Sequence, residues 1–126
     1  MNIETFREYC LSKKGATETF PFDEVTLVFK VMDKMFALTG LDSEDFTVNL
    51  KCDPERAEEL RATYPDDVLP GWHMNKKLWN TVRFEGSLSE SLLIDLIDHS
   101  YDLVVKGLPN KKREELMMWG NGPIAP

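Results

Sequence analysis

Residues 70–82 combine the side chains of this sequence that are best suited to binding chemistry. The stretch reads PGWHMNKKLWNTV, with two tryptophans, one histidine, two lysines and two asparagines after a Pro-Gly pair. It contains no aspartate or glutamate, although the whole chain has 22 acidic residues against 15 basic ones and a formal net charge of −7. Lysines neutralise phosphates, asparagines hydrogen-bond a backbone or a base edge, and an exposed tryptophan stacks on a base. The stretch is therefore the first candidate for a nucleic-acid contact.

Six residues of the stretch form the predicted nucleic-acid site: Trp72, His73, Asn75, Lys76, Lys77 and Asn80. In this site the lysines would bind phosphates, the asparagines would hydrogen-bond and Trp72 would stack. His73 would add positive charge only below about pH 6.5. Three further lysines on the solvated face of the expected sheet could widen the patch: Lys30, Lys34 and Lys51. The alternative interpretation makes the tryptophans core or lid residues and the lysines solubilising, and for Trp79, inside an expected strand, the core is favoured.

The distribution of charge leaves two interpretations open. A second basic segment, residues 106–113, contributes four positive charges and no negative one, while acidic residues gather at 42–45 and 55–59. If residues 70–82 and 106–113 meet in space, the molecule is electrically polarised; otherwise they are separate solvated charges. A negative domain repels nucleic acid at long range, so the net charge disfavours a generic nucleic-acid binder.

The sequence gives little support for catalysis. Asp98, His99 and Ser100 are consecutive in an expected helix, where neighbours point in different directions and cannot form a catalytic triad. His99 is better explained as a helix-surface or capping residue satisfied by a loop carbonyl. His73 could act as a general base near Asn75, but no nucleophile accompanies it. The sequence has no metal-ligand spacing, phosphate-binding glycine loop or dinucleotide fingerprint, so we expect a non-enzyme without metal or cofactor.

The cysteines and the hydropathy pattern bear on location. Cys10 and Cys52 are far apart and in no paired motif, which favours two small core residues in a reducing cytosol. No apolar run approaches the roughly 20 residues that span a membrane. The first residues, MNIETFRE, have neither the basic nor the apolar region of a signal peptide. We therefore expect a cytoplasmic protein without a membrane partner.

Periodicity predicts the elements that would position these residues. Helices are expected at residues 2–14, 53–63, 87–106 and 110–118, the third beginning with a capping box between Ser87 and Glu90. Strands are expected at residues 25–31, 35–39, 46–52 and 78–85, with a hairpin turn at Asp33-Lys34, after an edge segment at 17–22. Phe20 and Phe22 are expected to point into the core, and residues 66–69 to be a connector.

These elements predict the fold class and the domain organisation. Strands that alternate between apolar and polar residues, such as 46–52, have one covered face and one wet face. We therefore expect an α+β two-layer sandwich, an antiparallel sheet with helices mainly on one face. At 126 residues the chain is one domain, here residues 1–119, followed by a loose tail at 120–126. Nothing in the sequence demands more than a monomer.

Five segments also match a known family pattern: ETFPF at 18–22, FKV with KMFAL at 29–38, NLKCDPE at 49–55, residues 70–82, and DHSYDLV at 98–104. Through them the chain resembles the MmcQ/YjbR family of small bacterial proteins, up to about Arg113. The resemblance implies a fold like that of CyaY/frataxin-type and secretion-chaperone-type domains. It also implies the family's usual description as predicted DNA-binding proteins with a "double wing" arrangement.

The expected function is therefore binding, with DNA the leading ligand through residues 70–82. The alternative is a protein-binding or chaperone-like module without nucleic-acid activity, which would use the wet sheet face or the apolar cluster at 116–119. The other interpretation of that cluster is that it packs back on the open side or edge of the sheet.

Overall fold

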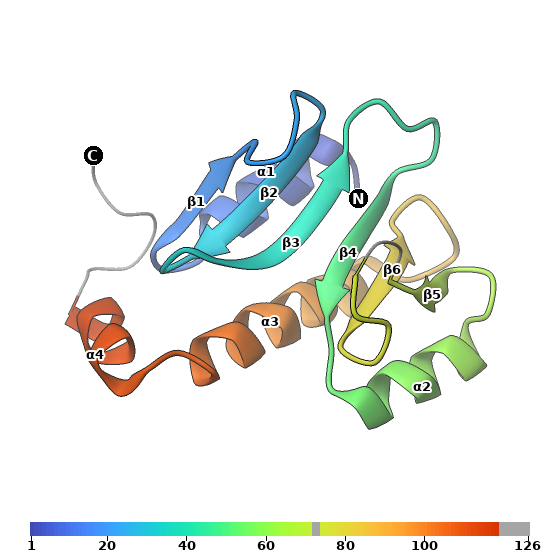
Figure 1. The fold of residues 1–126 in the computed structure, drawn as a ribbon. Coiled ribbons are helices and arrows are strands. Elements are labelled where there is room, and N and C mark those ends of the chain that lie inside the picture. The colour runs from blue at the N-terminus through green and yellow to red at the C-terminus, as the bar shows by residue number, and fades with distance from the viewer. Residues whose placement is uncertain (72–73, 119–126) are drawn as a thin grey trace.

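The computed structural model describes residues 1–71 and 74–118, and its described part holds one six-stranded antiparallel sheet and four helices (Figure 1). The strand order across the sheet is β1-β2-β3-β4-β6-β5. The strands are β1 (Ala16–Thr19), β2 (Thr26–Val31), β3 (Lys34–Gly40), β4 (Thr47–Lys51), β5 (Val68–Pro70) and β6 (Trp79–Arg83). The helices are α1 (Ile3–Leu11), α2 (Pro54–Thr63), α3 (Glu90–Lys106) and α4 (Asn110–Met118). The expected α+β class is confirmed.

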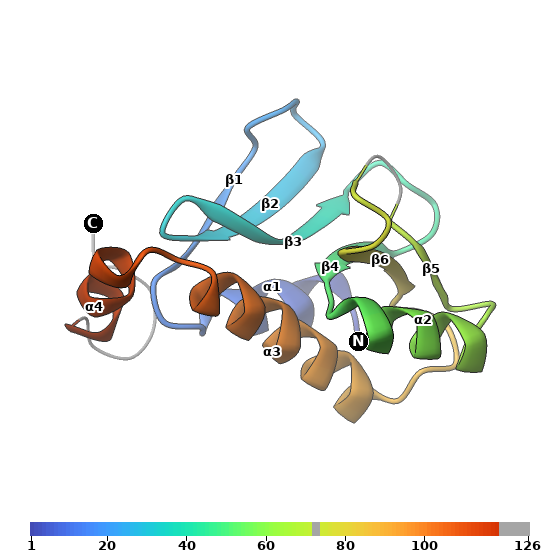
Figure 2. The same cartoon turned by 60° about the horizontal axis from the view of Figure 1, so that its bottom comes forward.

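One face of the sheet carries the main core. Figure 2 shows α1 and α3 on the same side of the sheet, and α3 contacts β2, β3 and β4. The fully buried ring of Phe6 in α1 meets three other phenylalanine rings at centroid distances of 5.4, 5.7 and 5.3 Å: Phe29, Phe46 and Phe84. The α3 stripe through Leu93, Ile97 and Val104 is buried against the same side. Aromatic and aliphatic burial therefore holds α1 and α3 to one layer.

The helix starts follow capping chemistry, with one correction. The side chains of Asn2 and Asp53 accept hydrogen bonds from the third residue beyond them, and Pro54 is the first residue of α2, as expected. The predicted capping box at Ser87 is wrong, because the N-cap of α3 is Ser89. Ser87 instead donates its hydroxyl to the buried carboxylate of Asp67 at 2.6 Å. A buried carboxylate needs donors more than a solvent-exposed helix end does.

The hairpin between β2 and β3 is one residue earlier than predicted. Its central residues are Met32 and Asp33, with φ angles of 49° and 66°, and Lys34 is already in β3. Positive φ at both central residues is typical of a type I′ turn, whose twist matches that of the paired strands. Aspartate tolerates this conformation better than most residues, so it marks the turn correctly but not its exact position.

The structure corrects three further expectations and does not describe the segment of a fourth. The side chains of Phe20 and Phe22 are 46% and 63% exposed, because both follow the end of β1 and lie in a loop. Residues 66–69 are not only a connector, since β5 pairs there with β6. In α4, Leu116 is buried but Met117 and Met118 are 75% and 86% exposed, so the late apolar cluster does not pack back as a unit. Trp119 and the predicted tail at 120–126 lie outside the described residues.

Across residues 1–71 and 74–118, none of the helices combines the length and the apolar character that a membrane crossing needs.

Candidate functional site

The sheet face that points away from α1 and α3 holds a continuous row of side chains. Residues paired directly across strands point to the same face. The register joins Val28 to Leu38, Leu38 to Asn49, and Asn49 to Thr81. These four residues therefore form a row across β2, β3, β4 and β6, which we call the open face together with the strand residues beside them.

Part of the open face is apolar. Val28, Leu38 and Trp79 are buried together in a second cluster, separate from the main core, and Met35, Met74 and Leu78 pack against it. Trp79 is therefore a core residue, as favoured from the sequence, but it belongs to the cluster on the open face. Alternation along residues 25–31 puts Val28 on the same face as Lys30, the face expected to be wet, yet Val28 is fully buried there. Residues 74–78 thus cover one part of the open face and leave the rest accessible.

The strands of the open face contain no acidic residue. Glu18 is the only acid in the six described strands, and its partner Phe29 lies in the main core, so Glu18 is on the helix side. There it forms an ion pair with Arg7 of α1 at 2.7 Å. The register places Lys30 opposite Met35 and Lys51 opposite Trp79, so both lysines are on the open face. An acid-free surface in a chain of net charge −7 favours an anionic ligand.

A groove of about 490 Å³ lies beside the apolar cluster. Leu38, Asn49 and Thr81 line it from the sheet, and Phe22 and Met74 line it from the connections after β1 and β5. Figure 2 shows the β1–β2 and β3–β4 connections on the side of the sheet opposite α3. The described residues that line the groove are all uncharged. Its size is within the usual range for small-ligand sites.

Hydrogen bonds fix the polar side chains of the groove. Thr81 donates its hydroxyl to Oδ1 of Asn49 at 2.5 Å, and Thr39 donates to the carbonyl of Thr47 at 2.8 Å. Within the part of the chain that the structure describes, the NH₂ group of Asn49 donates no hydrogen bond. The Asn49 amide is therefore held by its oxygen and presents a donor to the groove.

The predicted basic site begins with a close approach of two strands. A Cβ atom added to Gly71 would lie 2.8 Å from Cβ of Trp79, so only glycine lets β5 and β6 approach as they do. Asn75 accepts the backbone N–H of Lys77 on its side chain at 2.9 Å, which shapes the turn into β6. Arg61 of α2 donates to the carbonyl of Lys76 at 3.2 Å. These bonds position residues 75–77 between the sheet and α2.

Lys76 and Lys77 are exposed, as expected, and lie beside α2. They share a surface pocket with Pro54, Glu58 and Arg61. Arg61 therefore adds a third positive charge that sequence reasoning missed, and Glu58 opposes one of the three. The alternation of arginine and glutamate in α2 gave no indication that one arginine faces residues 76 and 77. Trp72 and His73 lie outside the described residues.

Asn80 cannot join this site from its position in β6. Its side chain is buried on the helix side, where Leu50, Leu60 and Leu96 surround a cavity of about 10 Å³. Neither its Oδ1 nor its Nδ2 has a hydrogen-bond partner among the described residues. The prediction that Asn80 contacts nucleic acid is therefore corrected, since the alternation along β6 turns it inward. The cavity is about the size of one water molecule, which could satisfy the amide.

The α4 part of the second basic segment lies apart from Lys76 and Lys77, although Gly107, near the start of that segment, lines one pocket with Trp79. In both views α4, which contains Lys111, Lys112 and Arg113, lies at the opposite end of the molecule from β5, β6 and α2 (Figures 1 and 2). The charges of α4 therefore do not combine with Lys76 and Lys77 into one basic surface, and for them the interpretation as separate solvated charges holds.

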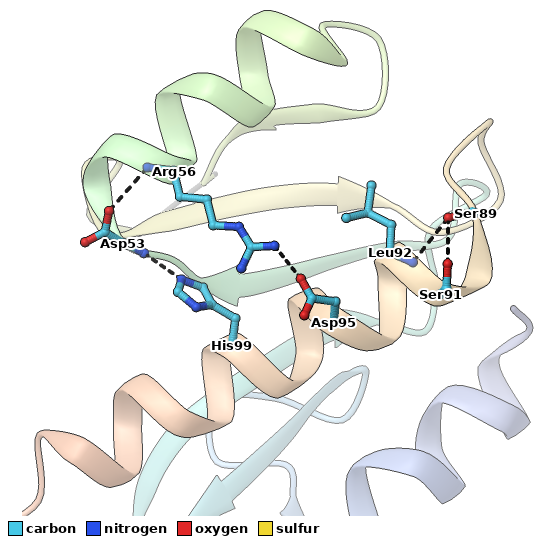
Figure 3. Close-up of polar contacts among 7 residues, drawn as sticks. All are labelled: Asp53, Arg56, Ser89, Ser91, Leu92, Asp95 and His99. Carbon is cyan, nitrogen blue, oxygen red and sulfur yellow. Dashed lines mark hydrogen bonds and ion pairs between the residues drawn. The ribbon is translucent and has the colours of Figure 1, made fainter.

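The residues considered for catalysis have structural roles. Asp98 accepts a hydrogen bond from Tyr9 at 2.5 Å and forms an ion pair with Lys13. Ser100 is fully buried and donates to the carbonyl of Phe36 at 2.5 Å. His99 accepts the backbone N–H of Asp53 at 3.1 Å through Nε2, next to the ion pair between Arg56 and Asp95 (Figure 3). Three consecutive residues thus face three different parts of the fold. His99 is satisfied as expected, although its partner is an N–H group rather than a carbonyl.

Lowering the pH is expected to weaken the contact between α2 and α3. Burial, aided by the nearby Arg56 charge, lowers the pKa of His99 below its usual 6.5. As the pH falls, His99 is therefore protonated in the unfolded chain before it is protonated in the folded protein. The contribution of neutral His99 to the free energy of unfolding is complete above about pH 6.5 and is lost as the pH falls through the folded pKa. Urea unfolding measures the free energy of unfolding at about pH 7 and about pH 5. The decrease between the two pH values should be smaller for His99→Gln than for the wild type. Equal losses would contradict this role of His99.

The cysteines and acids offer no reactive centre in the described residues. Cys10 and Cys52 are free and buried, as expected, and burial raises the pKa of the Cys52 thiol to about 11 and that of Cys10 further. Such thiols are poor nucleophiles at neutral pH. Within residues 1–71 and 74–118, no three or more His, Cys, Asp or Glu side chains lie together in a group that could hold a metal ion.

Comparison with known proteins adds a family and a fold. The YjbR family model matches residues 11–103. The uncharacterized protein YjbR of Escherichia coli strain K12 is 38% identical over 117 residues, which cover 93% of this chain and 98% of that protein. The uncharacterized protein YbdF of E. coli O157:H7 is 37% identical over 114 residues, or 90% of this chain and 92% of that protein.

Two solved structures resemble this one. The crystal structure of Deinococcus radiodurans protein DR2400 is 42% identical with a TM-score of 0.86, and the match covers 94% of this chain and 89% of that chain. A crystal structure of a Pseudomonas syringae protein is 28% identical with a TM-score of 0.67, over 82% of this chain and 98% of that chain.

Proposed function

This chain belongs to the YjbR family, and from that premise we propose that it is a non-catalytic binding protein whose ligand is DNA. The relatives found in the comparisons are themselves uncharacterized, so the choice of ligand depends on this chain's own surface. The free, buried state of both cysteines supports a cytoplasmic location, where DNA is accessible.

The acid-free open face is the observation that supports DNA most directly. A surface with Lys30 and Lys51 and no carboxylate in its strands attracts phosphates locally, even in a chain with an excess of acids. The nearest strand acid, Glu18, is neutralised by Arg7 on the other side of the sheet. At about 0.1 M salt the Debye length is about 10 Å, so salt screens the repulsion from more distant acidic residues. A phosphate close to the open face therefore responds mainly to the nearby lysines.

Lys76 and Lys77 form the second part of the proposed interface. Both are exposed and lie next to Arg61, which leaves a local excess of positive charge after Glu58 is counted. In this proposal they bind phosphates, and Asn75, whose side chain is engaged by Lys77 N–H, orients them rather than reading a base. Trp72 and His73, outside the described residues, keep their proposed roles in stacking and pH-dependent charge.

A protein-binding module is the second candidate, and one observation favours it. Phe20 and Phe22 are both exposed, Phe22 also lines the groove, and large exposed apolar side chains often mark partner surfaces. Such a surface would bind its partner with little dependence on salt, whereas DNA binding must weaken steeply as salt rises.

Fluorescence anisotropy with labelled DNA at several salt concentrations separates the candidates. The proposal predicts binding in the micromolar range or tighter at about 50 mM salt, with log affinity falling linearly against log salt. Absence of binding at about 50 mM salt, where the phosphate contribution is strongest, would overturn DNA as the ligand. Pull-down experiments with the protein as bait would then address the second candidate.

A further inference from the structure

We propose that the groove on the open face binds an unpaired base of single-stranded DNA, with the adjoining phosphates directed toward Lys51. This inference rests on the proposed function, since it names the form of DNA and the place of its base. It adds a base-binding site, made by the groove between Phe22 and Met74, to the phosphate contacts of Lys76 and Lys77.

The lining of the groove suits a nucleobase. A base is neutral and flat, with apolar faces and a hydrogen-bonding edge, so it needs apolar walls and a few polar groups rather than charges. Leu38 and Met74 supply apolar surface, and no charged residue lines the groove in the part of the chain that the structure describes. The NH₂ group of Asn49, whose oxygen is engaged by Thr81, supplies a donor for acceptor atoms on the base edge.

Charge sets the direction of the backbone. Asn49 and Lys51 are two residues apart in β4 and on the same face, at a separation of about 7 Å. Lys51 can therefore contact a phosphate next to a base held at Asn49. At the other end, Ser43 lines the groove within the exposed acidic loop of Asp42, Glu44 and Asp45, which repels phosphates. The base would therefore enter with its backbone on the Lys51 side.

The shape of the groove favours an unpaired base over a duplex. A base inside a double helix exposes only its groove edges, so a pocket that surrounds its faces must receive it out of the stack. Phe22 and Met74 stand on the connections at two sides of the groove, where they would contact such a base. Single strands reach the groove without the cost of unpairing, and they should bind more tightly.

Competition between a single strand and a duplex of the same sequence tests this inference. The wild type should prefer the single strand by about tenfold or more, the value of one stacked base. Asn49→Asp keeps the oxygen that accepts from Thr81, removes the donor and adds a negative charge, so the preference should disappear. Asn110→Asp makes the same chemical change at the start of α4, at the opposite end of the molecule, and should leave the preference intact.

A second variant fills the groove without a change of charge. Gly40 lines the groove, and a Cβ atom added there would meet only Oδ1 of Asp42, at an ordinary 3.6 Å. Gly40→Leu should therefore fold, which circular dichroism and the melting temperature check, and should lose the single-strand preference while duplex binding remains.

The outcomes separate this inference from the function on which it rests. Equal binding of single strand and duplex by the wild type, or an Asn49→Asp effect no larger than that of Asn110→Asp, would overturn the base-binding groove. If binding in that case still depended on Lys76 and Lys77, the proposed function would stand. Failure of both DNA forms to bind would remove both proposals.

Discussion

Replacing Lys76 and Lys77 together by alanine is expected to weaken DNA binding on the order of 50-fold at about 0.1 M salt. Each lysine that neutralises a phosphate contributes about 0.9 to the slope of log affinity against log salt, so the slope should fall by about 1.8. Both side chains are exposed, and among the described residues the two lysines form hydrogen bonds only through their backbones, so truncating the side chains should leave the fold unchanged. Anisotropy titrations at four or more salt concentrations measure both quantities.

The chain provides a matched control for this experiment. Lys111 and Lys112 are also adjacent and exposed, but they lie in α4, at the other end of the molecule (Figure 1). Lys111→Ala with Lys112→Ala changes the net charge by the same amount, so it reproduces any long-range effect without touching the proposed interface. Equal losses in the two double variants would mean that only net charge matters and would contradict a site at residues 76 and 77.

Ser100→Ala is expected to lower the free energy of unfolding by about 3 kcal/mol, because it leaves a buried acceptor and a part-buried donor unpaired. The hydroxyl of Ser100 donates to the carbonyl of Phe36 and accepts the backbone N–H of Lys51 at 2.9 Å. It therefore links α3 to β3 and β4 beyond their paired residues Ala37 and Leu50. Chemical denaturation of wild type and variant measures the difference. The same bond fixes the backbone of Lys51, so weaker DNA binding should accompany the loss.

Ser91 offers the control on the same helix. Its hydroxyl is exposed and contacts only the hydroxyl of Ser89 among the described residues, at 3.2 Å (Figure 3). Ser91→Ala should change the free energy of unfolding by no more than about 0.5 kcal/mol. An equally small change in Ser100→Ala would mean that the Phe36 carbonyl and the Lys51 N–H group find other hydrogen-bond partners. That result would contradict a stabilising role for the Ser100 hydroxyl.

Local patterns predicted most of the elements because their causes are local. Alternation in residues 46–52 correctly separates buried Val48 and Leu50 from partly exposed Asn49 and Lys51. The Asp53-Pro54 start of α2 depends on an N-cap side chain and on a proline at the first helical position, both of which are read from adjacent residues. The α+β class follows from the order of such elements, which needs no knowledge of distant contacts.

The errors arose where distant parts of the chain decide the outcome. Val28 was expected on a wet face, yet residues 74–78 return to cover it with Met74 and Leu78. Ser87 has the sequence of a cap, but the buried carboxylate of Asp67, twenty residues away, engages it instead. The spacing of hydrophobic residues within a segment predicts whether that segment is a helix or a strand. It does not predict contacts with distant segments, such as these two.

The candidate site was predicted in part for the same reason. The exposure of Lys76 and Lys77 follows from composition, since lysines are seldom buried. The groove was missed because Asn49, Thr81 and Met74 come from three separate segments that only the strand order β3-β4-β6 brings together. Asn80 was misplaced because an amide in a strand next to a basic loop resembles a surface residue, although its direction in β6 is inward.

The most direct test of the central claim is an NMR titration of the labelled protein with single-stranded DNA. The account predicts that backbone amide shifts change along the open face, at Asn49, Lys51 and Thr81, and at Lys76 and Lys77. Amides of α1 and α4, on the helix side and at the far end of the molecule, should stay unchanged (Figures 1 and 2). Shift changes confined to α4 and its lysines, or none at saturating DNA, would contradict a DNA-binding open face.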